Sequence, residues 1–468
     1  MQRNRRIDFV WCSVVQTILR FLKEGIGMQS STLAIIIIVL TIISFVLEKI
    51  PLAMTAMLSA LVMGLFIPEM PLSAIYAGFS STTVMMVAGM MIVGDSLFQT
   101  GMANKIGNAL IRSPIAKNER LFVVSVVALC TLLSAFLSNS GTIAMMMPLI
   151  GAAALRSQRV IRNKMVVMAA GIGCAIGGGA TLVGSTSQLT ANGILQKTAG
   201  YEEGIQLFDM TKGMAPLCLI MLLYFATVGY SIMKKVFKPE LGDDSFNVAA
   251  QSSSSLNEVP AWKGYLSLGT LILCVVGFVL TGYQPFKSWF NVGVIGLVGG
   301  TILITSGCMP LKPTLRDLDW NTLVILAAAQ GFAKGLDVSG GGKVIATFVL
   351  ELFGGPKASF VALMIAGLLV ITVLTQFMSN TALAAMMTPI YIAIALQMGI
   401  SPVPFVIMVA CATNIACSTP VGTPCVTQTL PAGYSYMDYV KVGGPLFIIL
   451  VIAACFIFPV VYPMTPLH

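Results

Sequence analysis

The sequence predicts an all-α polytopic membrane protein with about eleven transmembrane helices, arranged as two inverted repeats. Composition is the first reason: of 468 residues, 57% are hydrophobic and 10% are charged, and the mean hydropathy is +0.90. A soluble domain carries about 25% charged residues, so this chain has too little polar surface to face water. The second reason is that its apolar runs are long and continuous, which is typical of membrane helices. The third is an internal repeat of one short motif.

Residues 1–30 precede the first long apolar run. Their start is basic, and apolar side chains recur at helical spacing between Ile7 and Leu22. The unbroken apolar core and the small-residue cleavage site of a signal peptide are both missing. We therefore expect an amphipathic helix that lies in the cytoplasmic membrane interface. An alternative start at Met28 would omit this segment.

Apolar runs divide the rest of the chain in order. A first transmembrane helix is predicted at 31–49, a first repeat at 50–238 and a second repeat at 263–468. Between the repeats, a serine-rich stretch with mixed charges predicts a linker at 239–262. The predicted apolar runs lie near 32–47, 51–67, 82–99, 121–155, 165–196, 214–233, 265–282, 291–307, 321–336, 358–400, 402–430 and 440–462.

One motif occurs twice in the chain. FLSNSGTIAMMMPLI at 136–150 matches FMSNTALAAMMTPIY at 377–391, with Phe, Ser, Asn, Ala, Met, Met and Pro in the same places. Two shorter matches flank it in the same order, DSLFQTG with KGLDVSG upstream and TLVGST with TPVGTP downstream. Three matches in one order at nearly one offset predict that the chain is a duplication around the linker.

Basic residues orient the two halves. Four lysines or arginines lie at 105–120 before the first motif and four at 156–164 after it, whereas 382–437 contains none. Because basic residues stay cytoplasmic, the first motif is flanked by cytoplasmic loops and the second by external ones. The halves are therefore predicted to be inverted, with the N-terminus and the linker inside the cell.

A polar break at Ser138–Thr142 interrupts the apolar run at 121–155. The arms on either side, of roughly 17 and 13 residues, are short for a full crossing. Both flanks carry cytoplasmic-type charge, and the break recurs in the second half. We therefore predict a re-entrant hairpin in each half, since irregular backbone at membrane depth is tolerated where it is buried or lines a cavity. An ordinary external loop between two spans is the alternative.

A glycine-rich stretch follows the first motif. GIGCAIGGGATLVGSTSQ at 171–188 holds six glycines, and NIACSTPVGTPCVTQ at 414–428 holds two prolines and a glycine in the matching place. Each glycine costs a helix about 1 kcal/mol relative to alanine. Both stretches therefore predict helices that are unwound near their midpoints. Close helix packing is the alternative for Gly177–Gly179 alone.

The side chains at the tips and breaks are neutral. The only histidine is His468, and the ten cysteines show no metal-site spacing, so we predict neither an enzyme nor a metal centre. Helix N-termini attract anions, and freed carbonyls and amide oxygens coordinate hard cations such as sodium. A neutral site that holds both solutes suits cation-coupled uptake of an anion, or exchange of one anion for another.

At these motifs the chain resembles the divalent anion:sodium symporter family, the dicarboxylate, citrate and sulfate carriers of the ion transporter superfamily. The family hallmark is a Ser-Asn-Thr triplet at the tip of each of two re-entrant hairpins. Here the second triplet is Ser379–Thr381, and the first, Ser138–Ser140, reads Ser-Asn-Ser. The resemblance covers most of 50–462. It implies a scaffold domain that dimerises and a transport domain that moves as an elevator.

The resemblance also implies which residues bind the solutes. Each half would hold one sodium ion, and both halves together would hold the carboxylates of the anion. The first sodium set is Ser134, Ser138, Asn139 and the backbone near Gly184, and the second is Thr375, Asn380 and the backbone near Gly422. The anion set is Ser138, Asn139, Ser140, Ser379, Asn380, Thr381, Ser185 and Thr423.

Taken together, these features favour sodium-coupled uptake of a four-carbon dicarboxylate through the plasma membrane, by a homodimer in the lipid bilayer with no nucleic-acid partner. Sodium-independent exchange, citrate or sulfate transport, and cation/proton antiport are the alternatives. Asp95 and Lys334 occupy matching positions in the two repeats, and Asp337 lies nearby. Charges inside a membrane are functional by default, so Asp95 could relay protons; each could instead lie near a span end and form an ion pair.

Overall fold

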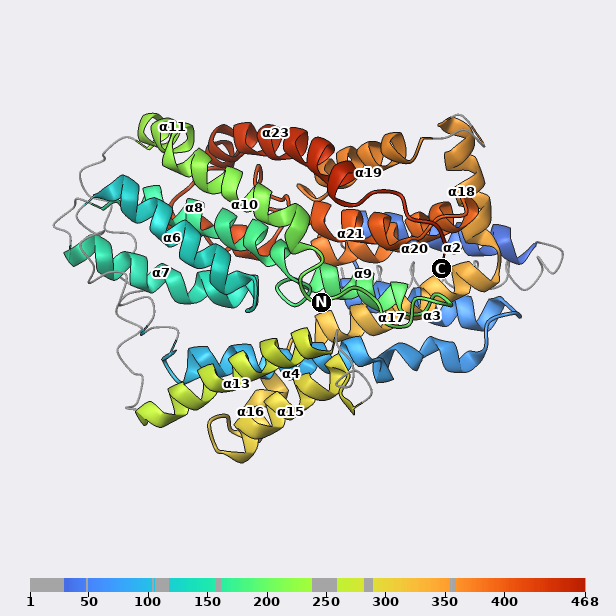
Figure 1. Cartoon of the computed structure of the whole chain (residues 1–468), viewed down its shortest axis with the longest axis horizontal. Helices are drawn as coiled ribbons and strands as arrows, with labels where there is room; N and C mark the ends of the chain where they lie inside the picture. Colours follow the sequence, from blue (N-terminus) through green and yellow to red (C-terminus); the bar gives the residue numbers. More distant parts are fainter. Residues whose placement is uncertain are drawn as a thin grey trace, which may run out of the picture.

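The computed structural model describes residues 29–47, 49–102, 105, 118–156, 161–237, 259–281, 289–353, 355 and 359–467. Most of the predicted N-terminal helix and of the linker lies outside these residues. The described part is built of helices, with no β-strand, and most of them run along the long axis of the molecule (Figure 1).

The first half begins with α2 (Ser30–Leu47) and α3 (Leu52–Phe66), which pack against each other. Two short 3-10 turns lead to α4 (Thr82–Gln99), whose first turn is capped by the Ser81 hydroxyl. The remaining elements are α6 (Glu119–Ser134), α7 (Asn139–Arg156), α8 (Asn163–Gly177), η4 (Gly178–Ala180), α9 (Thr186–Leu195), α10 (Thr211–Ala226) and α11 (Val228–Val236).

The second half repeats this order. α6 and α7 correspond to α19 and α20, and α8 with its following break corresponds to α21 and α22. The elements are α13 (Ala261–Leu280), α15 (Val292–Thr305), α16 (Leu311–Asp317), α17 (Trp320–Val338), α18 (Gly341–Leu352), α19 (Phe360–Leu374), α20 (Asn380–Gln397), α21 (Val403–Ala412), α22 (Pro424–Thr427), η7 (Leu430–Ala432) and α23 (Tyr436–Val461).

Helices of each half pack against helices of the other half. α4 packs against α15 of the other half, and α17 packs against α3. In the same way α9 packs against α20, and α22 packs against α7. The halves therefore form one interlocked molecule, and residues from both meet near its middle.

Four described helices, α4, α13, α20 and α23, are long and apolar enough to cross a membrane. α10 and α11 make a fifth if the pair, bent by 49°, counts as one span. Apolar side chains such as Leu132, Phe456 and Val460 are exposed, which suits a surface that faces lipid. By contrast, every residue of α8 from Met165 to Gly177 is buried, so α8 runs through the core.

The structure differs from the sequence predictions in three elements. The run at 214–233 is two helices rather than one, because the backbone bends at Thr227. α16 and α18 were not predicted, since both are short and contain charged residues. Breaks do interrupt the apolar runs at 121–155 and 358–400, but the first lies at 135–138 rather than at Ser138–Thr142, because residues 139–142 form the first turn of α7.

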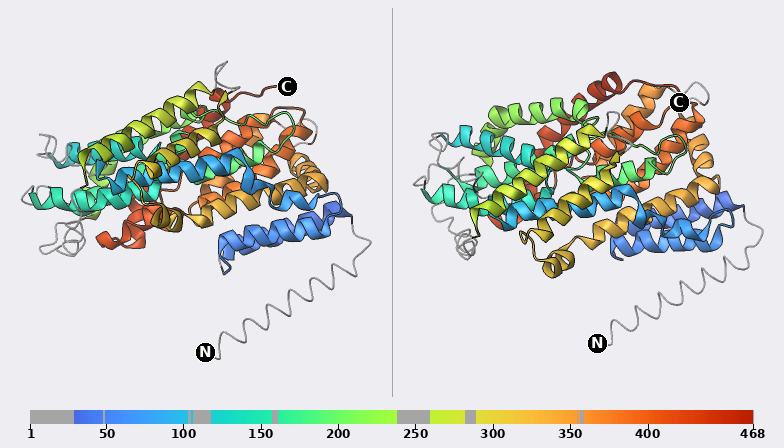
Figure 2. Two further views of the ribbon diagram at one scale, coloured as in Figure 1. Left: turned by 90° about the horizontal axis from the view of Figure 1, so that it is seen from below. Right: turned by 60° about the horizontal axis from the view of Figure 1, so that its bottom comes forward.

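The molecule has two ends that can be followed in Figures 1 and 2. We call the end at which α11 stops and α13 starts the linker end. There the carbonyl of Phe237 accepts a hydrogen bond from Arg162. The start of α2 lies at the opposite end, where Ser30 donates to Glu69 and a Cβ on Gly341 would meet the backbone of Ser31.

Candidate functional site

Polar side chains connect α6 and α7 at the turn between them, inside the protein. α6 ends at Ser134, which is fully buried, and α7 begins at Asn139. The Ser134 hydroxyl contacts the side-chain oxygen of Asn139 and lies 2.8 Å from the carbonyl oxygen of Cys174 on α8. One hydroxyl thus joins both arms of the hairpin to the core helix beside it.

The second half has the same connection. At the end of α19, the Thr375 hydroxyl lies 2.7 Å from the side-chain oxygen of Asn380 and 2.7 Å from the carbonyl of Thr413. We call Ser134 with Asn139 the first hydroxyl–amide cluster, and Thr375 with Asn380 the second. Two asparagines of the repeated motif are therefore each brought beside the hydroxyl residue that the family resemblance implied, in two matching pairs.

Each break places a glycine against the matching hairpin. A Cβ on Gly184 would lie 2.5 Å from the carbonyl oxygen of Gly178 and 2.7 Å from that of Ser134. A Cβ on Gly422 would collide with the carbonyl oxygen of Thr375. Main-chain carbonyls therefore converge beside a hydroxyl and an amide oxygen in both halves. Neutral oxygens of this kind are the ligands that hard cations prefer, so the residues present fit the predicted sodium sites.

The first triplet is exposed or half-buried, whereas the second triplet is mostly buried. Ser138 is exposed and its hydroxyl accepts a hydrogen bond from the Gly141 N–H at 3.1 Å, while Ser140 and Ser379 are half-buried. Thr381 is buried, and its hydroxyl lies 2.5 Å from that of Thr186 in the first break. Among the described residues no hydrogen bond joins one triplet to the other; the direct link runs from the second triplet to the first break.

The predicted hydroxyls of the breaks are both buried, and each has a neighbour two residues along the chain. The Ser185 hydroxyl lies 3.1 Å from that of Ser187, and the Thr423 hydroxyl lies 3.4 Å from the Cys425 sulfur. Ser185 and Thr423 hold equivalent places just before α9 and α22. Ser185 precedes the N-terminus of α9, a ten-residue helix, where an anion is favoured, whereas α22 has only four residues and begins with a proline.

Gln376 lies next to the second cluster in the chain, and the sequence analysis did not single it out. Its side-chain N–H groups donate to the carbonyl of Ile415 at 2.7 Å, and its oxygen accepts from the Ser418 N–H at 3.0 Å. It thereby ties the second hairpin to the second break. The one available signal was an amide inside an apolar run, directly after Thr375.

Two further buried amides lie where the breaks of the two halves meet. The Gln188 side chain donates to the carbonyl of Gly179 at 2.7 Å, and that of Asn414 donates to the Ser187 hydroxyl at 3.0 Å. In the described part of the chain, the side-chain oxygens of Gln188 and Asn414 have no hydrogen-bond partner. Because an unpaired buried acceptor is costly, these oxygens are available to a bound cation or water.

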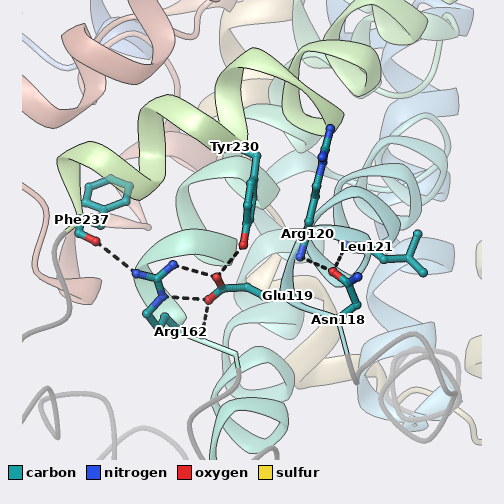
Figure 3. A network of polar contacts seen from close by, with 7 residues as sticks. All are labelled: Asn118, Glu119, Arg120, Leu121, Arg162, Tyr230 and Phe237. Atoms are coloured by element: carbon teal, nitrogen blue, oxygen red, sulfur yellow. Dashed lines mark hydrogen bonds and ion pairs between the residues drawn. The ribbon is translucent and has the colours of Figure 1, made fainter.

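Charge lies away from the tips, at the ends of the molecule. At the linker end, Arg162 pairs with Glu119 at 2.7 Å, and Tyr230 donates to the same carboxylate at 2.9 Å (Figure 3). Burial by itself raises the pKa of Glu119, but hydrogen bonds from Arg162 and Tyr230 outweigh it and hold the pKa below its usual range. This network fixes the starts of α6 and α8 to α11, before the apolar part of α6 begins.

Comparison with known sequences gives consistent matches. A family model described as a citrate transporter matches residues 42–399. The sodium-dependent dicarboxylate transporter SdcS of Staphylococcus saprophyticus is 22% identical over 451 residues, which cover 90% of this chain and 84% of that protein. A transporter of Haemophilus influenzae is 24% identical over 80% of each chain. The transporter YfbS of Escherichia coli is 35% identical over 159 residues, but the match covers only 25% of that protein.

Solved structures with the same fold are also membrane transporters. Neisseria gonorrhoeae MtrF, from a class of antimetabolite efflux pumps, has a TM-score of 0.60 at 16% identity and covers 94% of this chain and 97% of its own. The Alcanivorax borkumensis transporter YdaH has a TM-score of 0.57 at 14% identity, covering 82% and 86%. At these identities the likeness concerns the fold. The match to the family model covers most of the sequence, and the chain therefore belongs to the citrate transporter family, as a multi-pass membrane transporter of small anions and not an enzyme.

Proposed function

We propose that the protein is a sodium-coupled secondary transporter that takes up a four-carbon dicarboxylate through the cell membrane. The observation that carries the proposal is the pair of matching hydroxyl–amide clusters, each beside a glycine pressed against main-chain carbonyls. The sodium-dependent dicarboxylate transporter that is similar over 90% of the chain supports the same substrate and coupling ion.

In this proposal each cluster binds one sodium ion. The first uses Ser134, Ser138, Asn139 and the backbone near Gly184; the second uses Thr375, Asn380 and the backbone near Gly422. The unpaired oxygens of Gln188 and Asn414 add neutral acceptors between them. Moving a dianion against the membrane potential costs about 4.6 kcal/mol per 100 mV, so net uptake calls for about three coupled cations.

The anion binds between the tips of the two hairpins. Its carboxylates are held by the two triplets (Ser138–Ser140 and Ser379–Thr381), together with Ser185 and Thr423. Hydroxyl and amide donors at helix N-termini stabilise the carboxylates without a fixed positive charge. The cations supply that charge, so substrate and sodium bind together and neither is favoured alone.

The wider architecture follows from the packing of each half against the other. α6–α7 and α19–α20 are the re-entrant hairpins of two inverted repeats, and the helices that surround them form the moving transport domain. α2, α3, α4, α13, α15 and α17 form the scaffold, through which two copies dimerise. The linker end faces the cytoplasm, because basic residues gather there.

The first test is uptake of radiolabelled succinate into proteoliposomes, with and without an inward sodium gradient. Wild type is compared with Asn139→Ala, and with Ser44→Ala as a control that removes a half-buried hydroxyl bonded to Thr55, away from the tips. Sodium-driven uptake that Asn139→Ala abolishes and Ser44→Ala retains supports the proposal. Uptake that ignores sodium but needs internal dicarboxylate shows exchange instead. No uptake by folded protein overturns succinate, and citrate, sulfate and proton flux are measured next.

A further inference from the structure

A cavity of about 580 Å³ opens at the end of the molecule opposite the linker. It lies between the ends of α9 and α20 on one side and α17 with α18 on the other. Its charged lining consists of Lys197, Lys334, Asp337 and Lys343. The volume lies in the range that holds small-molecule ligands, roughly 300–1,000 Å³.

We call this space the lysine cavity, and the charges of its lining residues do not cancel. Lys334 donates to Asp337 at 2.8 Å, so the single carboxylate offsets one of three ammonium groups, and three minus one leaves two positive charges. The side chains of Lys197 and Lys343 have no ion-pair or hydrogen-bond partner among the described residues. Partial burial lowers the pKa of Lys197, because it disfavours the charged ammonium, although the residue as a whole remains exposed to water.

A helix N-terminus adds to this field. α18 is twelve residues long and starts at Gly341, and Gly340 and Gly342 line the cavity. The first turn of such a helix presents main-chain N–H groups and about half a positive charge. The lysines and the helix terminus are independent features, and both favour an anion in the same space.

The cavity is in line with the proposed substrate site. α9 and α20 line it with their C-terminal ends, and the same two helices begin at Thr186 and Asn380, beside the contact of Thr186 with Thr381. α9 has ten residues and is about 15 Å long, so one short helix separates the lysines from the triplet hydroxyls.

A second cavity of about 230 Å³, which we call the glutamate cavity, lies at the same end and differs in the charge of its lining. Glu202 and Glu203 line it, together with Asn192, Gln196 and Gln206. The two cavities therefore lie beside the same stretch of chain, just after α9, and carry opposite charge. An incoming anion is attracted to one and repelled by the other.

We propose that the lysine cavity is an outer capture site for the divalent anion, which binds there before it reaches the triplet residues. The inference rests on the proposed transport of a dianion, and it adds a second, peripheral binding step with named residues. A cavity of one charge sign focuses the field and raises the association rate of an oppositely charged solute by about tenfold or more at low ionic strength.

The first test measures whether the electrostatic potential in each cavity is positive or negative, and it does not depend on transport. Thr198→Cys places a thiol in the lysine cavity, and Gln206→Cys places one in the glutamate cavity. Each is labelled in proteoliposomes with an anionic and a cationic methanethiosulfonate reagent, and labelling of the wild-type cysteines is subtracted. We expect the anionic reagent to react about tenfold faster at 198, the cationic reagent to be favoured at 206, and succinate to slow labelling at 198 alone.

Removing the lysines is the decisive step of this test. Lys197→Gln combined with Lys343→Gln is expected to abolish the anionic preference at 198 and leave 206 unchanged. Lys212→Gln is the matched control, because Lys212 is paired with Asp209 at the same end and lines neither cavity. Equal rates for both reagents at 198, or a preference that survives the double substitution, would overturn the capture site.

The second test uses uptake. The double lysine variant is expected to raise the KM for succinate about tenfold at low ionic strength, to leave the maximal rate within about twofold, and to approach wild type as salt screens the field. An unchanged KM overturns the capture site. Charge-selective labelling by a protein that transports no dicarboxylate would instead refute the proposed function and leave an anion site in place, so the two failures are distinguishable.

Discussion

Ser134 and Thr375 each hold three segments of the chain together with one hydroxyl. In both halves that hydroxyl contacts the asparagine that starts the next helix and a carbonyl at or near the end of the buried helix alongside. A sodium ion that binds the asparagine oxygen would therefore also fix the angle between the hairpin arms. Binding of the ion and ordering of the tip are the same event at this scale.

The hydroxyl of Thr375 can be tested by isosteric substitution. Thr375→Val keeps the shape but removes the donor to Asn380 and Thr413, whereas Thr375→Ser keeps the hydroxyl. Because a hydrogen bond contributes about 1 kcal/mol, we expect Thr375→Val to raise the half-saturating sodium concentration about five- to tenfold. Thr375→Ser should stay within about twofold of wild type. Equal sodium dependence in all three proteins would contradict a cation at the second cluster.

Glu119 gives a prediction for stability. Glu119→Gln removes the charge from a pair whose side chains are 10% and 28% exposed, and we expect it to cost about 2 kcal/mol, between the surface and buried cases. Asp317→Asn breaks an exposed pair with Arg316, at 54% and 80%, and should have no measurable effect. Thermal unfolding in detergent measures both.

The same carboxylate sets a pH dependence of unfolding. A group whose pKa is lower in the folded state stabilises the protein above its unfolded pKa and loses that contribution as the pH falls through the folded pKa. The pKa of Glu119 is lowered, so the stability gap between wild type and Glu119→Gln should be full at pH 7 and should close below about pH 4. A gap that widens on acidification would contradict this assignment.

Which site residues a sequence can predict depends on how they are marked. Asn139 and Asn380 were predicted because a duplicated motif repeats them, and each lies beside the hydroxyl expected to accompany it. Gln376 and Asn414 were missed because their bonds go to residues about 40 positions away in one case and to the other half in the other. A single amide in an apolar run has no spacing that reveals its partner.

Among the described elements, α4 and α15 make the most extensive contact between the two halves. A Cβ on Gly89 would collide with the carbonyl oxygen of Gly296 and lie 2.7 Å from the Leu297 nitrogen. Small residues let membrane helices approach until their backbones touch, where packing rather than water-driven burial holds them together. The packing of α4 against α15 therefore rests on residues with no side chain.

Substitution of Gly89 tests how much the close packing of α4 against α15 contributes to the stability of the folded protein. Gly89→Leu forces α4 away from α15, and overpacking of this kind costs about 3 kcal/mol. Gly269→Leu, on α13, has nothing within 4 Å of its Cβ and is the matched control. We expect Gly89→Leu alone to lower the melting temperature and the yield of folded protein in size-exclusion chromatography. Normal melting of Gly89→Leu would show that the contact is not tight.

Elements with one strong signal were predicted, and those that depend on tertiary contacts were not. The breaks after α8 and α21 are marked by glycine and proline, and the helices do stop there. α18 was missed because its glycine-rich start predicts a turn, whereas packing against α2 and α20 makes a helix of it. The bend at Thr227 has one nearby signal, Gly229, where a Cβ would collide with the Tyr224 ring across the bend, but a single glycine in an apolar run does not predict a bend by itself.

For the whole molecule, the orientation of its two ends determines on which side of the membrane α2 begins. If the linker is cytoplasmic, α2 begins on the external side, because the start of α2 lies at the opposite end of the molecule from α11, which leads into the linker (Figure 1). A cytoplasmic N-terminus would then need residues 1–29 to cross the membrane as well. Residues 1–28 lie outside the described part, so the cytoplasmic N-terminus stays a prediction.

Epitope insertion tests this arrangement. Epitopes at 29 and 200 are both expected to bind antibody on intact cells, because these positions lie at the end opposite the linker. An epitope at 250, in the linker, should bind only after permeabilisation. Accessibility of 250 in intact cells would reverse the assigned orientation. Opposite sidedness of 29 and 200 would contradict the packing of α2 itself.

The neutral tips determine how acidity acts on the whole transporter. Neither triplet contains a titratable side chain, so between pH 5 and 8 the ionisation that changes at this site is that of the cargo. The pH profile of uptake should therefore shift when one dicarboxylic acid is exchanged for another with a different second pKa. It should stay in place for Asp95→Asn. A profile that shifts with Asp95→Asn instead would make the protein, rather than its solute, the carrier of the proton.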